Sequence, residues 1–292
     1  MNFTERLKHI FKNGNIITKL IFVNVAVYLL VSVLSIFFKL FGLSQLEYTR
    51  WFSVPSNLQW LITHFWTPIT YMFYHERFFH ILFNMLVLFW FGRIFLLYYS
   101  EKQVLSLYFL GGLFGAVAYI VAYNLFPYYE AASYYSLLMG ASGAILAILT
   151  ASAVRAPDME LPLLLIGRVK LKWIAVATIL ISFFGITSEN GGGEIAHLGG
   201  ALAGYLFAVS ERKGRDITLL INKIIDFFVN LFRPRPKKKS TVYHAQKMSS
   251  EEYNQKKARD EKEIDHILDK IKTSGYESLT TEEKKKLFDQ KR

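Results

Sequence analysis

Apolar residues along the first 210 positions form long runs separated by short polar stretches. Residues 16–38 form a 23-residue run with few polar interruptions, and about 20 apolar residues are enough for a helix to cross a hydrocarbon core of about 30 Å. Further runs cover residues 80–98, 104–123, 138–154, 171–186 and 195–209. The pattern predicts an all-α membrane protein with six transmembrane helices, of which the last three are short.

The charged residues divide the chain into two unequal parts. Residues 1–210 hold 13 of the 34 Lys and Arg and 9 of the 23 Asp and Glu, so the last 82 residues are far richer in charge. We therefore predict an amphipathic N-terminus over residues 1–15, a six-span core over 16–210, an interfacial helix and basic linker over 211–240, and a small helical tail over 241–292. Acids and bases alternate in the tail instead of collecting on one face, so we expect no nucleic acid as a partner.

The loops alternate in charge. Lys and Arg are frequent before the first span and after the second, fourth and sixth, whereas residues 124–137 and 187–194 hold none. The positive-inside rule then places both termini in the cytoplasm, and we expect a multi-pass protein of a bacterial inner membrane. In residues 217–232, Asn222, Asp226 and Asn230 recur every four positions, which favours a helix lying in the membrane interface over a seventh span. The basic linker that begins at Arg233 is suited to bind anionic lipid, although a solvated hinge would have the same composition.

Several polar residues fall at one predicted depth. The second, fourth and sixth spans run in the same direction, and near their N-terminal ends lie His80 and Asn84, Ser142, and His197. Polar side chains within a membrane are costly and usually mark function or a water-filled cavity. Ser142 lies in a Gly-Ala-Ser-Gly sequence, whose glycines permit a tight turn around an exposed hydroxyl.

Each of these residues also has a purely structural interpretation. The Gly-Ala-Ser-Gly sequence could serve close helix packing, since small residues recur every four positions on the fourth span (Gly143, Ala147, Ala151) and on the sixth (Ala196, Gly200, Gly204, Ala208). Such packing would bring the fourth and sixth spans together, so it also supports a catalytic pair. The two histidines and the asparagine could form interhelical hydrogen bonds only.

A Ser–His pair predicts nucleophilic chemistry. His197 can act as general base toward the Ser142 hydroxyl, while His80, Asn84 and the backbone N–H of Ser142 can donate to a developing oxyanion. Glu194 precedes His197 by three residues, and we expect it to be a solvated helix-start residue rather than a partner of the imidazole. His75 is expected in the loop before the second span. The chain has no cysteine, and its histidines lack the acidic companions of a metal motif, so we expect neither a metal nor another cofactor.

The ordered combination of His80-x-x-x-Asn84, Gly140-x-Ser142-Gly143 and Ala196-His197-x-Gly199-Gly200 resembles the rhomboid family of intramembrane serine proteases. The resemblance covers residues 18–210. It implies a six-helix core, a Ser142–His197 dyad, an oxyanion site with His80 and Asn84, and no cofactor. It also implies that transmembrane proteins are the substrates, and the tail resembles a cytoplasmic extension of some bacterial members. Leu146 stands where the family often has an aromatic residue.

These observations lead to one main hypothesis, a serine endopeptidase that cleaves transmembrane segments. A catalytically inactive rhomboid-like protein that binds transmembrane helices is the alternative. A small-solute transporter is disfavoured because the predicted spans have no mid-membrane carboxylate. The physiological substrate and the oligomeric state are left open by the sequence.

Overall fold

A computed structural model describes residues 2–42, 45–163, 167–232 and 250–289. It divides into two compact units, residues 1–233 and 234–292. The basic linker beginning at Arg233 lies outside the described residues.

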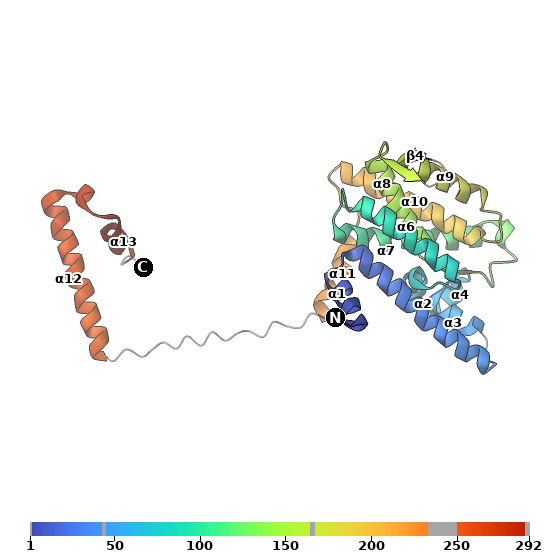
Figure 1. The fold of residues 1–292 in the computed structure, drawn as a ribbon, viewed down its shortest axis with the longest axis horizontal. Helices are drawn as coiled ribbons and strands as arrows, with labels where there is room; N and C mark the ends of the chain where they lie inside the picture. Colours follow the sequence, from blue (N-terminus) through green and yellow to red (C-terminus); the bar gives the residue numbers. More distant parts are fainter. Residues whose placement is uncertain (1, 43–44, 164–166, 233–249, 290–292) are drawn as a thin grey trace. The chain divides into compact units, whose positions relative to one another are not determined.

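The first unit is mostly helical (Figure 1). Its longer helices are α1 (Phe3–Asn13), α2 (Ile16–Leu40), α6 (Phe78–Phe95), α7 (Glu101–Leu125), α8 (Ser142–Arg155), α9 (Leu171–Phe184), α10 (Gly191–Arg212) and α11 (Leu219–Phe232). Among the described residues, α2, α6 and α7 are long and apolar enough to cross a membrane, and α8 and α9 are shorter apolar helices.

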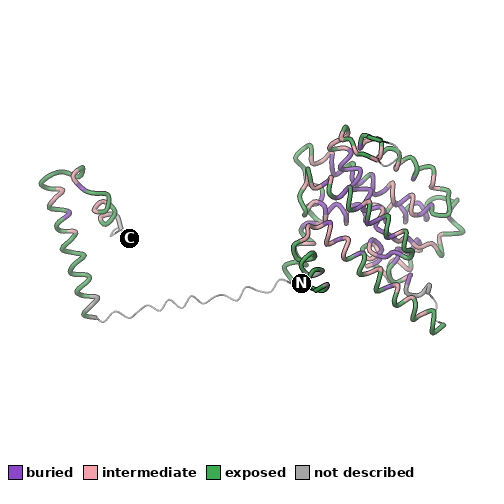
Figure 2. Tube along the Cα trace, in the orientation of Figure 1, coloured by how far each residue is buried: buried purple, intermediate pink, exposed green. Residues whose placement is uncertain are grey.

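Helix α8 forms the centre of this unit. Every residue from Gly143 to Ala153 is buried, and α8 packs against α6, α7, α9 and α10. Figure 2 shows the buried residues concentrated on the inner helices, while the outer helices are largely exposed. Many of those exposed side chains are apolar, among them Leu30 on α2, Phe83 on α6 and Ile181 on α9. An apolar exterior around a packed interior is what a helical bundle requires in lipid.

The chain is mostly helical, as expected, and its loops also contain short strands. The first long loop folds into α3 (Gln45–Phe52), β1 (Val54–Pro55), α4 (Leu58–Thr63), α5 (Thr67–Thr70) and η1 (Tyr71–Phe73). After α7 come η2 (Pro127–Tyr129) and β2 (Leu137–Leu138), which pairs antiparallel with β1. Because Leu137 and Leu138 belong to this ladder, α8 begins only at Ser142.

A second antiparallel pair, β3 (Glu160–Leu163) and β4 (Gly167–Lys170), joins α8 to α9. Pro157 and Pro162 disfavour a helix, because proline cannot donate the backbone hydrogen bond that a helix interior requires. The backbone groups on either side pair across the hairpin instead.

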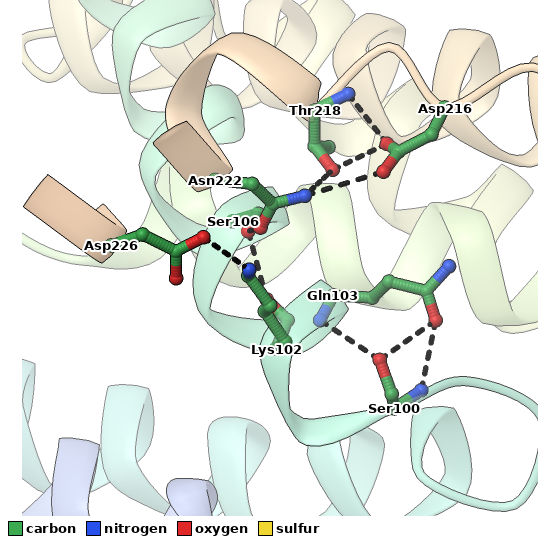
Figure 3. Close-up of polar contacts among 8 residues, drawn as sticks. All are labelled: Ser100, Lys102, Gln103, Ser106, Asp216, Thr218, Asn222 and Asp226. Atoms are coloured by element: carbon green, nitrogen blue, oxygen red, sulfur yellow. Dashed lines mark hydrogen bonds and ion pairs between the residues drawn. The ribbon is translucent and has the colours of Figure 1, made fainter. Parts of the chain in front are cut away.

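Helix α11 is fixed to the start of α7 by polar contacts (Figure 3). Asn222 accepts a hydrogen bond from Ser106, and Asp226 pairs with Lys102 at 2.7 Å. The polar face of α11 therefore lies against α7, while apolar side chains such as Phe227 and Leu220 are exposed. This arrangement leaves an apolar face available to lipid, as an interfacial helix requires.

The second unit is a helical hairpin of α12 (Ser250–Ser274), η3 (Tyr276–Ser278) and α13 (Thr281–Asp289). Ile267 and Leu279 are buried in it. A capping box begins α13, because the Thr280 N–H donates to the Glu283 carboxylate at 2.7 Å and the Glu283 N–H donates to the Thr280 hydroxyl at 3.3 Å. Lys270 and Glu283 form an ion pair between the two helices.

Candidate active site

A cavity of about 460 Å³ lies between α6, α8, α9 and α10. The four predicted site residues, His80, Asn84, Ser142 and His197, all line it. They come from three helices and from positions as far apart as 80 and 197. The folding of the chain therefore brings the predicted set together, while the chemical role of each residue stays a prediction.

Gly140 shapes the approach to Ser142. Its φ of +109° is a conformation that L side chains rarely adopt. A Cβ at this position would also lie 2.7 Å from the imidazole of His80. Glycine is therefore required on both grounds, and it lets the His80 ring lie directly against the turn that leads into Ser142. Since Ser142 is the first residue of α8, its N–H is among the amides of the first turn, which lack intrahelical acceptors.

The small-residue stripes pack α8 against α10, as predicted. A Cβ on Gly200 would overlap the carbonyl group of Gly143, and one on Gly204 would overlap that of Ala147. A Cβ on Gly143 would lie 3.1 Å from the carbonyl oxygen of Ala196. Because Gly143 follows Ser142 and Ala196 precedes His197, this contact holds the serine and the histidine at one level. Within the described residues, no hydrogen bond joins Ser142 directly to His197.

The Nδ1 atom of His197 has two partners. It lies 3.1 Å from Oε2 of Glu194 and 3.0 Å from the hydroxyl of Ser182 on α9. Glu194 is a helix-start residue, as expected, but the expectation that it is solvated and not a partner of the imidazole is wrong: only 18% of its side chain is exposed. The helix begins at Gly191, four residues before the predicted span, so Glu194 lies within its first turn and on the face of His197. Both contacts engage Nδ1, which leaves Nε2 as the ring nitrogen available to act as a base.

Comparison with models of protein families gives matches to two regions of this chain. The Rhomboid domain model matches residues 63–213, a segment that contains all four predicted site residues and about half of the chain. The chain belongs to the rhomboid family. A second model, a family of unknown function designated DUF6576, matches residues 250–289 in the helical tail. A comparison with curated proteins gives no match.

Within the rhomboid domain, Asn84 and His80 are linked to each other. The Nδ2 atom of Asn84 donates to the backbone carbonyl of His80 at 2.9 Å, and Asn84 is only 7% exposed. This bond uses one of the two amide hydrogens and fixes the side chain on the cavity wall. The second amide hydrogen is then available to a group inside the cavity.

His75 is a residue that the sequence interpretation undervalued. It precedes α6 as predicted, yet it is 1% exposed and its ring lies 5.0 Å from that of His80. Its Nε2 accepts the N–H of Ala141 at 3.4 Å, and its Nδ1 faces the carbonyl of Phe73 at 3.3 Å. Burial lowers the pKa of His75 to about 4, so the ring is neutral at pH 7, as an Nε2 acceptor must be. His75 thus supports the turn before Ser142 and packs against His80. In the sequence, only the closeness of His75 to His80 could have suggested that His75 supports the site.

Proposed function

We propose that this rhomboid-family protein is an intramembrane serine endopeptidase. The observation that carries the proposal is that Ser142, His197, His80 and Asn84 line one cavity, with Nδ1 of His197 held by Glu194. A serine hydroxyl is a poor nucleophile unless a positioned base removes its proton. An imidazole held at Nδ1 presents Nε2 for that task.

In the proposed reaction, the Ser142 hydroxyl attacks the carbonyl carbon of the scissile peptide bond as Nε2 of His197 takes its proton. The carbonyl oxygen becomes an oxyanion, to which Asn84, His80 and the Ser142 N–H donate. The intermediate then collapses, the C–N bond breaks, and the protonated His197 transfers its proton to the leaving amine. Water attacks the resulting ester by the same route and regenerates Ser142.

The walls of the cavity favour an apolar substrate. Phe83, Val87 and Phe91 from α6 face it together with Ile174 from α9. A transmembrane segment that unwinds near its end would present an apolar side chain to these walls and its peptide bond to the polar residues. We therefore propose transmembrane proteins as the substrates.

We also propose a six-span topology formed by α2, α6, α7, α8, α9 and α10, with both termini in the cytoplasm. Arg155 and Arg212, the last residues of α8 and α10, lie at the helix ends opposite the cavity. The positive-inside rule supports placing that end in the cytoplasm of a bacterial inner membrane. Reporter fusions after Arg292 that gave an external signal would contradict this topology.

The test uses purified full-length protein, a fluorophosphonate probe and a panel of single-span proteins in liposomes. We expect the probe to label Ser142, and we expect Ser142→Ala and His197→Ala each to abolish cleavage almost completely. The double variant should be little worse than either single one, because members of one catalytic unit are strongly non-additive. Asn84→Ala should leave residual activity, with a loss on the order of 10²–10³ for a single oxyanion donor.

Ser188→Ala, which changes an exposed serine outside the cavity, is the matched control and should behave like the unchanged chain. Cleavage by Ser142→Ala, or labelling at another serine, would contradict the mechanism. A folded protein that neither reacts with the probe nor cleaves any member of the panel would favour the alternative, a rhomboid-like protein that binds transmembrane helices without turnover.

A further inference from the structure

A second cavity, of about 360 Å³, lies at the opposite end of the bundle from the candidate active site. It is lined by Tyr98, Tyr99, Gln103, Arg155, Glu211 and Arg212. Arg155 ends α8 and Arg212 ends α10, so the cavity joins the far ends of the two helices that carry Ser142 and His197. At 1.5 Å per residue, the 14-residue α8 separates the two cavities by about 20 Å.

The two arginines give this cavity an excess of positive charge. In the described part of the chain, neither guanidinium lies within ion-pairing distance of a carboxylate. Arg212 donates to the backbone carbonyl of Val154, and Arg155 lies over the ring of Tyr98 at 5.4 Å. The one carboxylate in the lining, that of Glu211, accepts a hydrogen bond from the Gln103 side chain at 3.0 Å. Most guanidinium donors therefore remain available to a ligand.

Tyr99 supplies an independent observation. Its hydroxyl oxygen is shielded from solvent and, among the described residues, has no hydrogen-bond partner. Its ring is fixed by packing against Phe95 at 4.4 Å and Phe207 at 5.2 Å. A buried hydroxyl without a partner costs free energy, so this hydroxyl would be stabilised by an acceptor group bound beside the two arginines.

We propose that this cavity binds a phosphate group, and that at this end of the bundle the group belongs to the headgroup of an anionic phospholipid. Guanidinium groups form paired hydrogen bonds with phosphate oxygens, and a tyrosine hydroxyl can donate to a third. The proposed topology places the cavity at the cytoplasmic surface, where anionic headgroups are found. A soluble phosphate compound would present the same chemistry, and the experiment below distinguishes the two sources.

A phosphate in this position would contact α8, α10 and the turn between α6 and α7 at once. A ligand that binds the folded protein but not the unfolded chain stabilises the fold by mass action. We therefore expect binding to raise the unfolding temperature. Because this readout does not involve cleavage, the inference can fail while the proposed protease function holds, and the reverse is also possible.

The experiment titrates purified full-length protein in a neutral detergent with dihexanoyl phosphatidylglycerol, dihexanoyl phosphatidylcholine or inorganic phosphate, and follows the unfolding temperature. We expect saturable stabilisation by phosphatidylglycerol at concentrations at least tenfold below those needed for the other two. Arg155→Gln should weaken this response at least tenfold. Tyr99→Phe, which keeps the packed ring and removes only the hydroxyl, should weaken it several-fold.

Arg93→Gln is the matched control, because Arg93 is an exposed arginine in the last turn of α6 that does not line the cavity. It should respond as the unchanged chain does. If inorganic phosphate stabilised the protein as well as phosphatidylglycerol does, the cavity would still be a phosphate site, but its ligand would be a soluble phosphate compound and not a lipid. Absence of stabilisation by all three, or an unchanged response in both Arg155→Gln and Tyr99→Phe, would overturn the proposal.

Discussion

The contact between Glu194 and His197 provides the sharpest test of the proposed mechanism. Glu194 is a positioning residue in this scheme, since its carboxylate touches Nδ1 of the imidazole at 3.1 Å and Glu194 is not among the residues that line the cavity. Its substitution by Gln keeps the size of the side chain and an acceptor oxygen but removes the negative charge. The imidazolium formed during the reaction then loses its charged partner.

The size of the effect follows from the geometry. A hydrogen bond to a charged group contributes about 1.5–3 kcal/mol and a neutral one about 0.5–1.5 kcal/mol. The side chains of His197 and Glu194 are only 20% and 18% exposed, so solvent screens this pair less than a surface pair. The difference of about 1–1.5 kcal/mol corresponds to a roughly 5- to 13-fold lower rate of reaction at Ser142 for Glu194→Gln. Ser182→Ala, which removes a neutral partner, should cost no more than about 10-fold.

The assay measures the rate at which the fluorophosphonate probe labels Ser142, together with kcat, KM and the unfolding temperature. We expect the labelling rate and kcat to fall together while KM and the unfolding temperature change little. Glu189→Gln, in the exposed loop before α10, is the control and should label at the normal rate. If Glu194→Gln labels within twofold of the unchanged chain, or if its slower labelling is matched by a large loss of thermal stability, Glu194 does not position the base.

Three further predictions concern the packing and the tail. Gly200→Ala should lower the free energy of unfolding by about 1–3 kcal/mol and reduce cleavage, because the methyl group would overlap the Gly143 carbonyl. Denaturation in detergent measures the loss of stability, and Leu202→Ala, on the exposed side of α10, should cause a much smaller loss. Removal of the chain after α11 should leave cleavage in detergent intact, since we place the tail on the cytoplasmic side; complete loss of activity in a folded truncated chain would refute this. The pKa of Glu283 is lowered to about 2, mainly by the hydrogen bond from the Thr280 N–H and next by Lys270. The stabilisation of the hairpin by Glu283 is therefore fully present above the ordinary carboxyl pKa of about 4.5, and it is lost as the pH falls toward 2. Because the chain has no cysteine of its own, spin labels can be attached to cysteines introduced at exposed positions of α12 and α13. The distance between the two labels should increase as the pH falls from about 4.5 toward 2, and an unchanged distance at pH 2 would contradict this prediction.

The sequence alone determined the features that depend on local periodicity and side-chain size. Runs of apolar residues identified the long helices, because every backbone group in such a run must be satisfied within its own helix. The spacing of Gly200 and Gly204 predicted the contact with α8, since only small side chains permit so close an approach.

Only the tertiary structure decided which polar groups meet. Ser182 reaches His197 from a different helix, and the turn before Ser142 rests on His75 from the first long loop. Glu194 was on the right helical face by spacing, but whether it faces water or the imidazole depends on where α10 begins and how it is rotated against α9. Rotation and tilt are set by the packing of all neighbouring side chains at once. The polar partners of a buried imidazole therefore emerge only when the helices are assembled.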